Sequence, residues 1–265
     1  MILEGLTGSE QVVGPAGREY ESSREVDEMF QNFMMEAAEA AGLQLSDNQL
    51  QQFNRYYELL IEWNEKMNLT AITEPREVAV KHMVDSLTAL ETGLFAEGCT
   101  IIDVGTGAGF PGLPLKIYRP DLKLTLMDSL QKRVGFLETV VAELGLAEVH
   151  CVHARAEEGA RNKAYREKFD IAVSRAVAAL PVLAEYTLPF VKKNGFLVAL
   201  KGAKYAEEAE AAERALSLLG GSAPKCREVT LPGLTDKRAI VTVKKVKPTP
   251  KAYPRKAGTP TKKPL

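Results

Sequence analysis

The spacing of apolar positions predicts a long helix near the start of the chain. Between residues 46 and 67, apolar side chains recur at the spacing of one helix face, at Leu50, Phe53, Tyr57, Leu60 and Ile61. Ser46 and Gln49 form a capping box, which predicts where this helix begins. The pattern predicts a helix that packs one face against a core.

Two more helices are predicted on either side of this one, over residues 25–41 and 75–92. Gly42 ends the first, and Pro75 in the first turn favours the start of the second. We therefore interpret 25–98 as a helical subdomain. Residues 1–24 lack periodicity and carry a Gly-Pro pair, so we expect a mobile extension there.

From Thr100 onward, short apolar runs alternate with helical stretches. Five of these runs predict strands: TIIDV, KLTLMD, EVHCVHAR, FDIAVSR and GFLVALKG. Continuous apolar strands that alternate with helices indicate a parallel sheet covered on both faces. Two later runs, CREVTLP and RAIVTVKKV, have no helix between them and predict an antiparallel hairpin at the sheet edge. The fold class is therefore α/β, with a Rossmann-like domain over 99–246 that ends in a hairpin.

The segment 247–265 contains five prolines and no core-forming pattern, so we expect a basic, extended tail. An alternative is that it folds back on the domain, with Tyr253 as an aromatic anchor. Charge is uneven along the chain: residues 1–50 hold ten acids and two bases, whereas 244–265 hold eight bases and no acid. The basic end suggests contact with a polyanion, although a solvated tail is an equally good interpretation.

The composition argues against membrane-spanning, secreted, disulfide-rich and zinc-binding proteins. The chain has 265 residues, a net charge of −1 and 45% hydrophobic residues, as in soluble globular proteins. It has neither an apolar run long enough to cross a membrane nor a secretory signal pattern. The three scattered cysteines, Cys99, Cys151 and Cys226, argue against a disulfide framework or a zinc site. We expect a cytoplasmic monomer without a metal ion.

A glycine-rich segment, DVGTGAGFPG, follows the first predicted strand, where open α/β sheets bind ligands. Gly107, Gly109 and Gly112 fit the dinucleotide pattern G-x-G-x-x-G, which alone is weak evidence. Asp103 begins the pattern D-x-G-x-G-x-G, found in Rossmann-like S-adenosylmethionine (SAM) methyltransferases. A carboxylate beside the loop favours a ligand with an ammonium and a sulfonium group, and it would repel a pyrophosphate.

A second acid, Asp128, ends the second predicted strand, 23 residues after Gly105. An acid at this place accepts hydrogen bonds from ribose hydroxyls in NAD and SAM enzymes alike. The terminal hairpin favours SAM, because it is characteristic of the methyltransferase fold. Two alternatives stay open at this point: an NAD-dependent oxidoreductase, and a non-catalytic RNA-binding assembly factor on the same fold.

Seven separated motifs resemble those of one protein family and occur in the same order: YYELLIEWNEKMNLTAIT, KHMVDSL, DVGTGAGFPGLPLKI, DSLQKRVGFL, SRAVA, LKG and YPRKAGTPTKKPL. Together they resemble the bacterial 16S ribosomal RNA guanine-N7 methyltransferases, formerly called glucose-inhibited division protein B. The resemblance runs from about residue 27 to residue 265. It implies a SAM-dependent enzyme that methylates N7 of one guanine, position 527 in the 530 loop of 16S rRNA, in the small ribosomal subunit.

The resemblance also implies where the cofactor binds. Gly105 and Phe110 of the loop, Ala156 and Glu157 after the third strand, and Arg175 after the fourth would contact SAM. Asp128 and Ser129 would hold the ribose, and Asp103, Gly107 and Gly109 belong to the same loop. No residue is certain to be catalytic, and the candidates for positioning the substrate are Arg175, Lys201, His82, Asn68 and Asp85.

The residues that follow the predicted strands indicate which atom of the substrate receives the methyl group. The place after the fourth strand reads SRAV rather than the Asn/Asp/Ser-Pro-Pro-aromatic motif of amine methyltransferases, so amine methylation is disfavoured. Neither Cys151 nor Cys226 resembles the activated thiolate that cytosine C5 requires. Guanine N7 has a free lone pair and needs no deprotonation, which a site without an evident base permits.

An RNA substrate requires cations for its phosphates. The candidates near the loop are Lys132, Arg133, Arg175, Lys201, Lys204 and Arg238, and those in the tail are Lys251, Arg255 and Lys256. Guanine N7 is hidden in the deep groove of an RNA helix, so we expect a loop or an opened structure as substrate.

Overall fold

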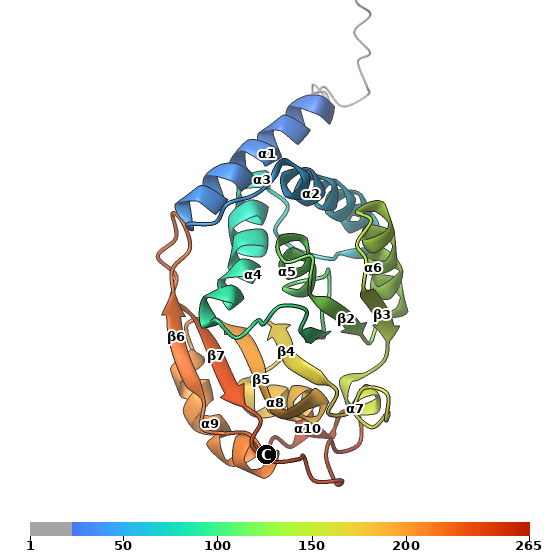
Figure 1. Ribbon diagram of the computed structural model, residues 1–265, viewed down its shortest axis with the longest axis vertical. Coiled ribbons are helices and arrows are strands. Elements are labelled where there is room, and N and C mark those ends of the chain that lie inside the picture. Colours follow the sequence, from blue (N-terminus) through green and yellow to red (C-terminus); the bar gives the residue numbers. More distant parts are fainter. Residues whose placement is uncertain (1–22) are drawn as a thin grey trace, which may run out of the picture.

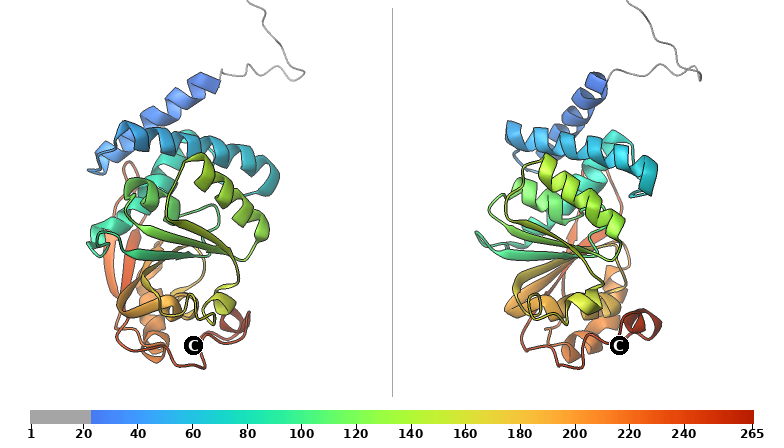
Figure 2. Two further views of the ribbon diagram at one scale, coloured as in Figure 1. Left: turned by 45° about the vertical axis from the view of Figure 1, so that its right-hand side comes forward. Right: turned by 90° about the vertical axis from the view of Figure 1, so that its right-hand side faces the viewer.

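The computed structural model describes residues 23–265 of the chain, with side chains from Met29 onward (Figure 1). The extension expected at 1–24 lies outside the described residues except for Ser23 and Arg24. The described chain has a layer of amino-terminal helices stacked on a helix–sheet–helix sandwich (Figure 2).

The amino-terminal layer is helical, as the sequence predicts. Its elements are α1 (Ser23–Ala40), α2 (Asp47–Met67), α3 (Pro75–Val78), η1 (Ala79–Val84), α4 (Asp85–Leu87) and η2 (Thr88–Thr92). The Ser46–Gln49 capping box is present at the start of α2. Phe53, Tyr56 and Leu60 follow helical spacing and are buried against the core.

The predicted helix over 75–92 occupies the expected span, but its hydrogen bonding changes along it. An α turn gives way to the π-helical segment η1, then to α4 and the 3₁₀ segment η2. Pattern spacing alone does not show such a change, because each of these segments is only three to six residues long. π turns frequently occur at functional sites, and η1 carries His82.

A seven-stranded sheet with the order β3-β2-β1-β4-β5-β7-β6 forms the centre of the fold. Its strands are β1 (Thr100–Val104), β2 (Lys123–Asp128), β3 (Val149–His153), β4 (Phe169–Arg175), β5 (Val191–Lys201), β6 (Lys225–Val229) and β7 (Arg238–Lys244). The first five are parallel, and β7 pairs antiparallel with both β5 and β6. The predicted α/β fold with a terminal hairpin at the edge is confirmed.

Helices cover both faces of the sheet (Figure 2). They are α5 (Gly112–Tyr118), α6 (Gln131–Glu143), α7 (Ala156–Gly159), α8 (Leu180–Thr187), η3 (Leu188–Phe190), α9 (Tyr205–Leu218) and α10 (Thr259–Lys262). On one face, α5 and α6 lie between the sheet and α2; on the other face, α8 and α9 pack together. The parallel strands thus direct their carboxyl ends, and the loops that follow them, to one edge of the sandwich.

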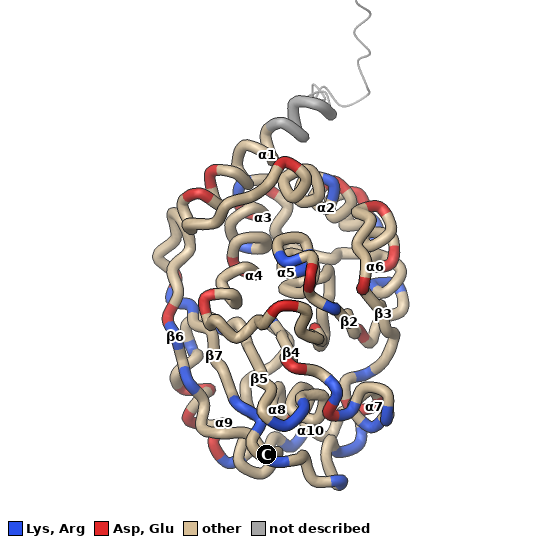
Figure 3. The backbone as a smooth tube through the Cα atoms, viewed as in Figure 1, with Lys and Arg blue, Asp and Glu red and all other residues tan. Residues whose placement is uncertain are grey.

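The expectation of an extended tail is wrong: the segment 247–265 folds back across the domain beneath α8 and α7 (Figure 1). Thr249, Pro254 and Pro260 are buried, and Tyr253 packs on the cluster formed by α8, α9 and β7, as in the alternative interpretation. Figure 3 shows the charge asymmetry in space, with acids gathered on α1, α2 and α6 and bases around α7, α8 and α10.

Candidate functional site

The glycine loop follows β1 and turns sharply into α5. Gly105 has a φ of +71°, a conformation that glycine adopts without strain. A Cβ atom at this position would lie 2.8 Å from a methyl group of Val177. The loop therefore passes so close to the turn after β4 that only glycine fits.

Asp103 holds this loop from beneath. Its Oδ2 atom accepts hydrogen bonds from the Thr106 hydroxyl at 2.7 Å and from the Gly112 amide at 2.8 Å. Burial raises the pKa of Asp103 to about 7, while these two hydrogen bonds oppose that rise. Its Oδ1 atom is buried and has no hydrogen-bond partner among the described residues. Asp103 thus holds the glycine loop in shape through two hydrogen bonds.

Asp128, the acid predicted to hold the ribose, lies at the carboxyl end of β2 and is buried. Its Oδ2 accepts a hydrogen bond from the Gly107 amide, and its Oδ1 accepts one from the Leu130 amide, both at 2.9 Å. Arg133 approaches the same carboxylate at 3.6 Å. Asp128 therefore positions the loop, and each of its oxygens keeps a lone pair for a further donor.

A pocket of about 190 Å³ opens beside the loop. It brings together four residues that the resemblance places at the cofactor: Gly105, Ser129, Ala156 and Glu157. We call it the donor pocket, and its other lining residues are Val104, Met127, Ala154, Arg155, Val177, Tyr186, Gly258 and Thr261. Its lining has more apolar than polar surface, which suits a nucleoside.

A second pocket, of about 340 Å³, lies on the other side of the turn that follows β4. We call it the acceptor pocket, and it is lined by Ile72, Lys81, His82, Asp85, Thr88, Arg175, Ala176, Leu200, Lys201, Gly202, Val229, Arg238 and Ala239. The turn formed by Arg175, Ala176 and Val177 separates the two pockets, because Val177 lines one and the other two line the second.

Asp85 is the centre of an ion-pair network in the acceptor pocket. Arg175 donates to its Oδ2 at 2.8 Å, and Arg238 donates to its Oδ1 at 3.0 Å. The side chain of Asp85 is 5% exposed, whereas those of Arg175 and Arg238 are 13% and 24% exposed. Both carboxylate oxygens of Asp85 are therefore already engaged, each by one guanidinium group.

His82 belongs to the same network. Its Nδ1 atom lies 3.2 Å from both the Arg175 guanidinium and the Lys81 carbonyl, and its Nε2 atom lies 2.8 Å from the Thr70 hydroxyl. Burial, and then the charge of Arg175, lower the pKa of His82 to about 3. His82 is therefore neutral at pH 7 and unsuited to act as a general base.

Phe110 connects the loop to this network. Its ring stacks on His82, with ring centroids 4.6 Å apart, and the Arg175 guanidinium lies 4.8 Å from its centroid. Tyr56 of α2 packs on the other side and donates a hydrogen bond to the Ala108 carbonyl. The amino-terminal helices thus fix the glycine loop through aromatic contacts.

The remaining predicted site residues lie in different surroundings. Asn68 ends α2 in a left-handed conformation and lines neither pocket. Lys201 donates to the Ala178 carbonyl and pairs with Glu208, both at 2.6 Å. Arg255 pairs with the buried Glu185 at 2.6 Å. Exposed cations that could meet phosphates are Lys132, Lys204, Lys251 and Lys256.

Sequence reasoning missed eight residues of the donor pocket: Val104, Met127, Ala154, Arg155, Val177, Tyr186, Gly258 and Thr261. Val177 follows the SRA segment, so its place after a strand end was a usable signal. Tyr186 lies within α8 without a distinguishing pattern. Gly258 and Thr261 lie in the tail, which carries no periodicity that would connect it to the loop.

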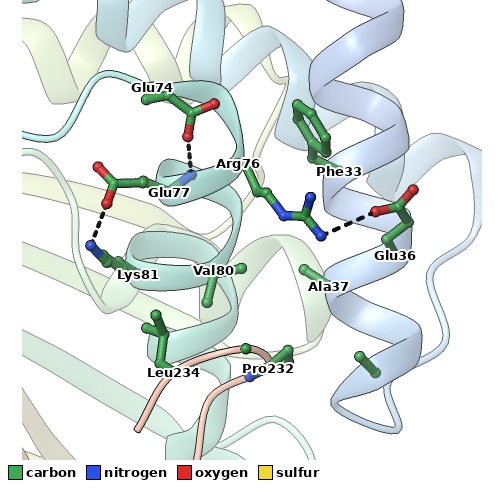
Figure 4. A pocket seen from close by; sticks show the side chains of 12 residues that line it. Phe33, Glu36, Ala37, Glu74, Arg76, Glu77, Val80, Lys81, Pro232 and Leu234 are labelled. Atoms are coloured by element: carbon green, nitrogen blue, oxygen red, sulfur yellow. Dashed lines mark hydrogen bonds and ion pairs between the residues drawn. The ribbon is translucent and has the colours of Figure 1, made fainter. Parts of the chain in front are cut away.

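Other features of the described chain lie apart from these pockets. A hollow of about 400 Å³ between α1, the 74–81 segment and the loop that joins β6 to β7 is lined by Phe33, Arg76 and Leu234, among others (Figure 4). Burial raises the pKa of Cys151 to about 11, so it is a weak nucleophile. Within residues 23–265, no cluster of three His, Cys, Asp or Glu could hold a metal ion, and no helix is long and apolar enough to cross a membrane.

The sheet order, the glycine loop and the acid that ends β2 together define a SAM-dependent methyltransferase of the Rossmann-like class. A solved SAM-dependent methyltransferase from Aquifex aeolicus has the same fold, with a TM-score of 0.50 and 19% identity over 68% of this chain and 97% of that chain. An NAD-dependent oxidoreductase is not favoured by these findings.

The family profile GidB, described as rRNA small subunit methyltransferase G, matches residues 49–238. The ribosomal RNA small subunit methyltransferase G of Alkaliphilus metalliredigens is 51% identical over 88% of this chain and 97% of its own length. The protein of that name from Lactobacillus helveticus is 54% identical over 83% of this chain and 93% of its own length. The chain therefore belongs to the GidB family, and its cofactor is SAM.

Proposed function

We propose that this protein transfers a methyl group from SAM to N7 of guanine 527, in the 530 loop of 16S rRNA, in the cytoplasm. Family membership supports methylation of small-subunit rRNA. The observation that carries the finer proposal is the adjacency of the two pockets across the turn formed by Arg175, Ala176 and Val177. A donor in one pocket and a base in the other would meet at this turn.

The donor pocket fits the cofactor. Gly105 leaves room where any side chain would strike Val177, and Met127 and Ala156 offer apolar contacts to an adenine ring. SAM supplies an activated methyl group on a positive sulfur. The protein's share is positioning, because an in-line displacement depends mainly on the alignment of its reactants.

The acceptor pocket fits a nucleophile that needs no deprotonation. Asp85 is held by two arginines, burial lowers the pKa of His82 to about 3, and Lys201 pairs with Glu208. Cations here can donate to the guanine O6 atom, which lies beside N7 on the same base edge. The methylated guanine carries a positive charge, which the Asp85 carboxylate would partly balance.

The test is to incubate the full-length protein with labelled SAM and 16S rRNA, then identify the labelled nucleoside after digestion. We expect 7-methylguanosine at one position and no label in RNA that carries adenine at position 527. Naked 16S rRNA, a precursor particle and the small subunit would be compared as substrates. Label found only on exocyclic amines or on cytosine C5 would refute the N7 assignment.

A further inference from the structure

The donor pocket has one wall that comes from the far end of the chain. Gly258 and Thr261 line it opposite Gly105 and Ser129 of the sheet edge. Gly258 caps the start of α10 and Thr261 lies within this helix, which lies beside α8 and α7 (Figure 1). The pocket is therefore completed by a segment outside the Rossmann-like sheet.

Three polar contacts hold this segment against the pocket. The Gly258 amide donates to Glu157 Oε1 at 2.8 Å, and the Thr261 hydroxyl lies 2.7 Å from the Tyr186 hydroxyl. Arg255 makes a bidentate pair with Glu185, with its side-chain nitrogens 2.6–3.1 Å from the carboxylate. Two of these contacts use residues that themselves line the pocket, Glu157 and Tyr186.

The beginning of the tail is anchored separately. The Thr249 amide donates to Glu167 at 2.7 Å, and its hydroxyl accepts a hydrogen bond from the fully buried Lys245 at 2.6 Å. Arg166 donates to the carbonyls of Thr249 and Tyr253, both at 2.9 Å. The tail is thus fixed at its start, so the turn at Gly258 can leave the pocket without the whole segment detaching.

We propose that the segment 255–265 forms the outer wall of the SAM pocket, and that SAM binding and docking of this segment are coupled, with Glu157 as the residue that positions it. The inference rests on the proposed function, because it takes the ligand of this pocket to be SAM. A ligand that contacts only the docked form must favour docking by the same factor by which docking favours the ligand. Glu157 connects the two because its carboxylate borders the pocket and accepts the tail amide.

The first experiment measures this coupling on the full-length protein by limited proteolysis with trypsin. Lys251 and Lys256 are exposed but lie among backbone groups that are held in the docked tail, so cleavage there requires local opening. Saturating S-adenosylhomocysteine should slow cleavage after Lys256 at least fivefold. Lys237, in the exposed loop between β6 and β7, is the internal control, and cleavage after it should not change.

The second experiment compares Gly258→Pro with Gly258→Ala in the full chain. Gly258 has a φ of +78° and no atom within 4 Å of a Cβ, so alanine adds only backbone strain and keeps the amide. Proline cannot adopt this φ and lacks the donor to Glu157. Gly258→Pro should weaken SAM binding at least fivefold by calorimetry, and Gly258→Ala should weaken it less.

The outcomes separate the coupling from the proposed function. If S-adenosylhomocysteine binds but leaves cleavage after Lys256 unchanged, the coupling is overturned, whether or not the proline variant folds. The same conclusion follows if Gly258→Pro folds and binds SAM as tightly as the unmodified chain. If the full-length protein does not bind SAM, or binds it equally well after Gly105→Val, the proposed cofactor site fails, and the inference fails with it.

Discussion

The glycine loop, residues 103–112, and the tail, residues 247–265, look alike in sequence. Both are rich in glycine or proline, and neither has the periodicity of a helix or strand. In the structure both are ordered, and both border the donor pocket. The loop has the place and form that its sequence predicts, whereas the tail does not extend into solvent.

The difference lies in where each segment finds its hydrogen-bond partners. The loop has partners within itself, since Asp103 accepts from Thr106 and Gly112, in addition to Asp128 of the adjacent strand β2, which accepts from Gly107. The tail is held by Glu157, Arg166 and Glu185, which belong to other elements. Irregular backbone is predictable when its partners are local, and is easily mistaken for a solvated tail when they are distant.

The largest expected effect concerns the loop side and is a dependence of stability on pH. The pKa of His82 is about 3 in the folded protein against an ordinary value of 6.5, because the ring is buried beside Arg175. Between these values the unfolded chain binds a proton that the folded chain does not, so stability falls as pH drops from 6.5 toward 3. His82 alone contributes a slope of up to about 1.4 kcal/mol per pH unit. Asp103, whose pKa is raised to about 7 by burial, contributes a slope of the opposite sign above pH 3.8.

Denaturant unfolding at several pH values measures this slope. His82→Gln should remove the contribution of His82 from this slope, because glutamine does not titrate. His150→Gln is the control, since His150 is exposed on β3 and should leave the slope unchanged. An unaltered slope in His82→Gln would mean that burial beside Arg175 does not lower the pKa of His82 in the folded protein.

A change in the tail gives the next largest effect. Arg255→Gln removes the bidentate partner of Glu185, whose side chain is 1% exposed, and leaves a buried carboxylate poorly paired. Hydrogen bonds to charged groups contribute about 1.5–3 kcal/mol, and we expect a loss of stability of that order. Thermal unfolding would show it, with Lys256→Gln as the neighbouring exposed control.

The Arg255→Gln variant tests directly whether the tail is docked on the domain or solvated. If the tail were solvated, Arg255→Gln and Lys256→Gln would both leave the melting temperature unchanged. If the ion pair fixes the tail, the double variant Glu185→Gln with Arg255→Gln should recover part of the loss, because it removes the unpaired charge.

Much of the fold was predictable from the sequence because its elements have local signals. The capping box at Ser46 and the apolar strand runs each define their element within a few residues. Asp103 and Asp128 were placed at the loop for the same reason, although both turn out to hold loop amides. The pairing of Asp85 with Arg175 and Arg238 was not predictable, because it joins residues from three separate elements through tertiary packing.

Replacement of Asp128 tests how far the loop depends on the neighbouring strand β2. Asp128→Ala removes the acceptor of the Gly107 and Leu130 amides, together with any acceptor for a ribose hydroxyl. Removing a charge-assisted hydrogen bond of about 1.5–3 kcal/mol corresponds to SAM binding that is about ten- to a hundredfold weaker. Asp128→Asn keeps one oxygen acceptor, so its affinity for SAM should lie between those of the unmodified protein and of Asp128→Ala. Calorimetry measures both, with the exposed Asp236→Ala as control.

The smallest expected effect concerns the exposed cations of the tail. Arg255 is engaged by Glu185, so the tail's interaction with RNA must come from side chains that stay in solvent, such as Lys251, Lys256 and Lys262. Each phosphate that is no longer neutralised should flatten the plot of log affinity against log salt by about 0.7 to 0.9. The triple variant with glutamine at these positions should therefore bind 16S rRNA with a shallower salt slope while its melting temperature and SAM affinity stay the same. Replacing Lys66, Lys123 and Lys193, which are exposed elsewhere, removes the same charge and controls for its general effect. Equal slopes in the two triple variants would mean that the docked tail forms the wall of the donor pocket and takes no specific part in holding the RNA.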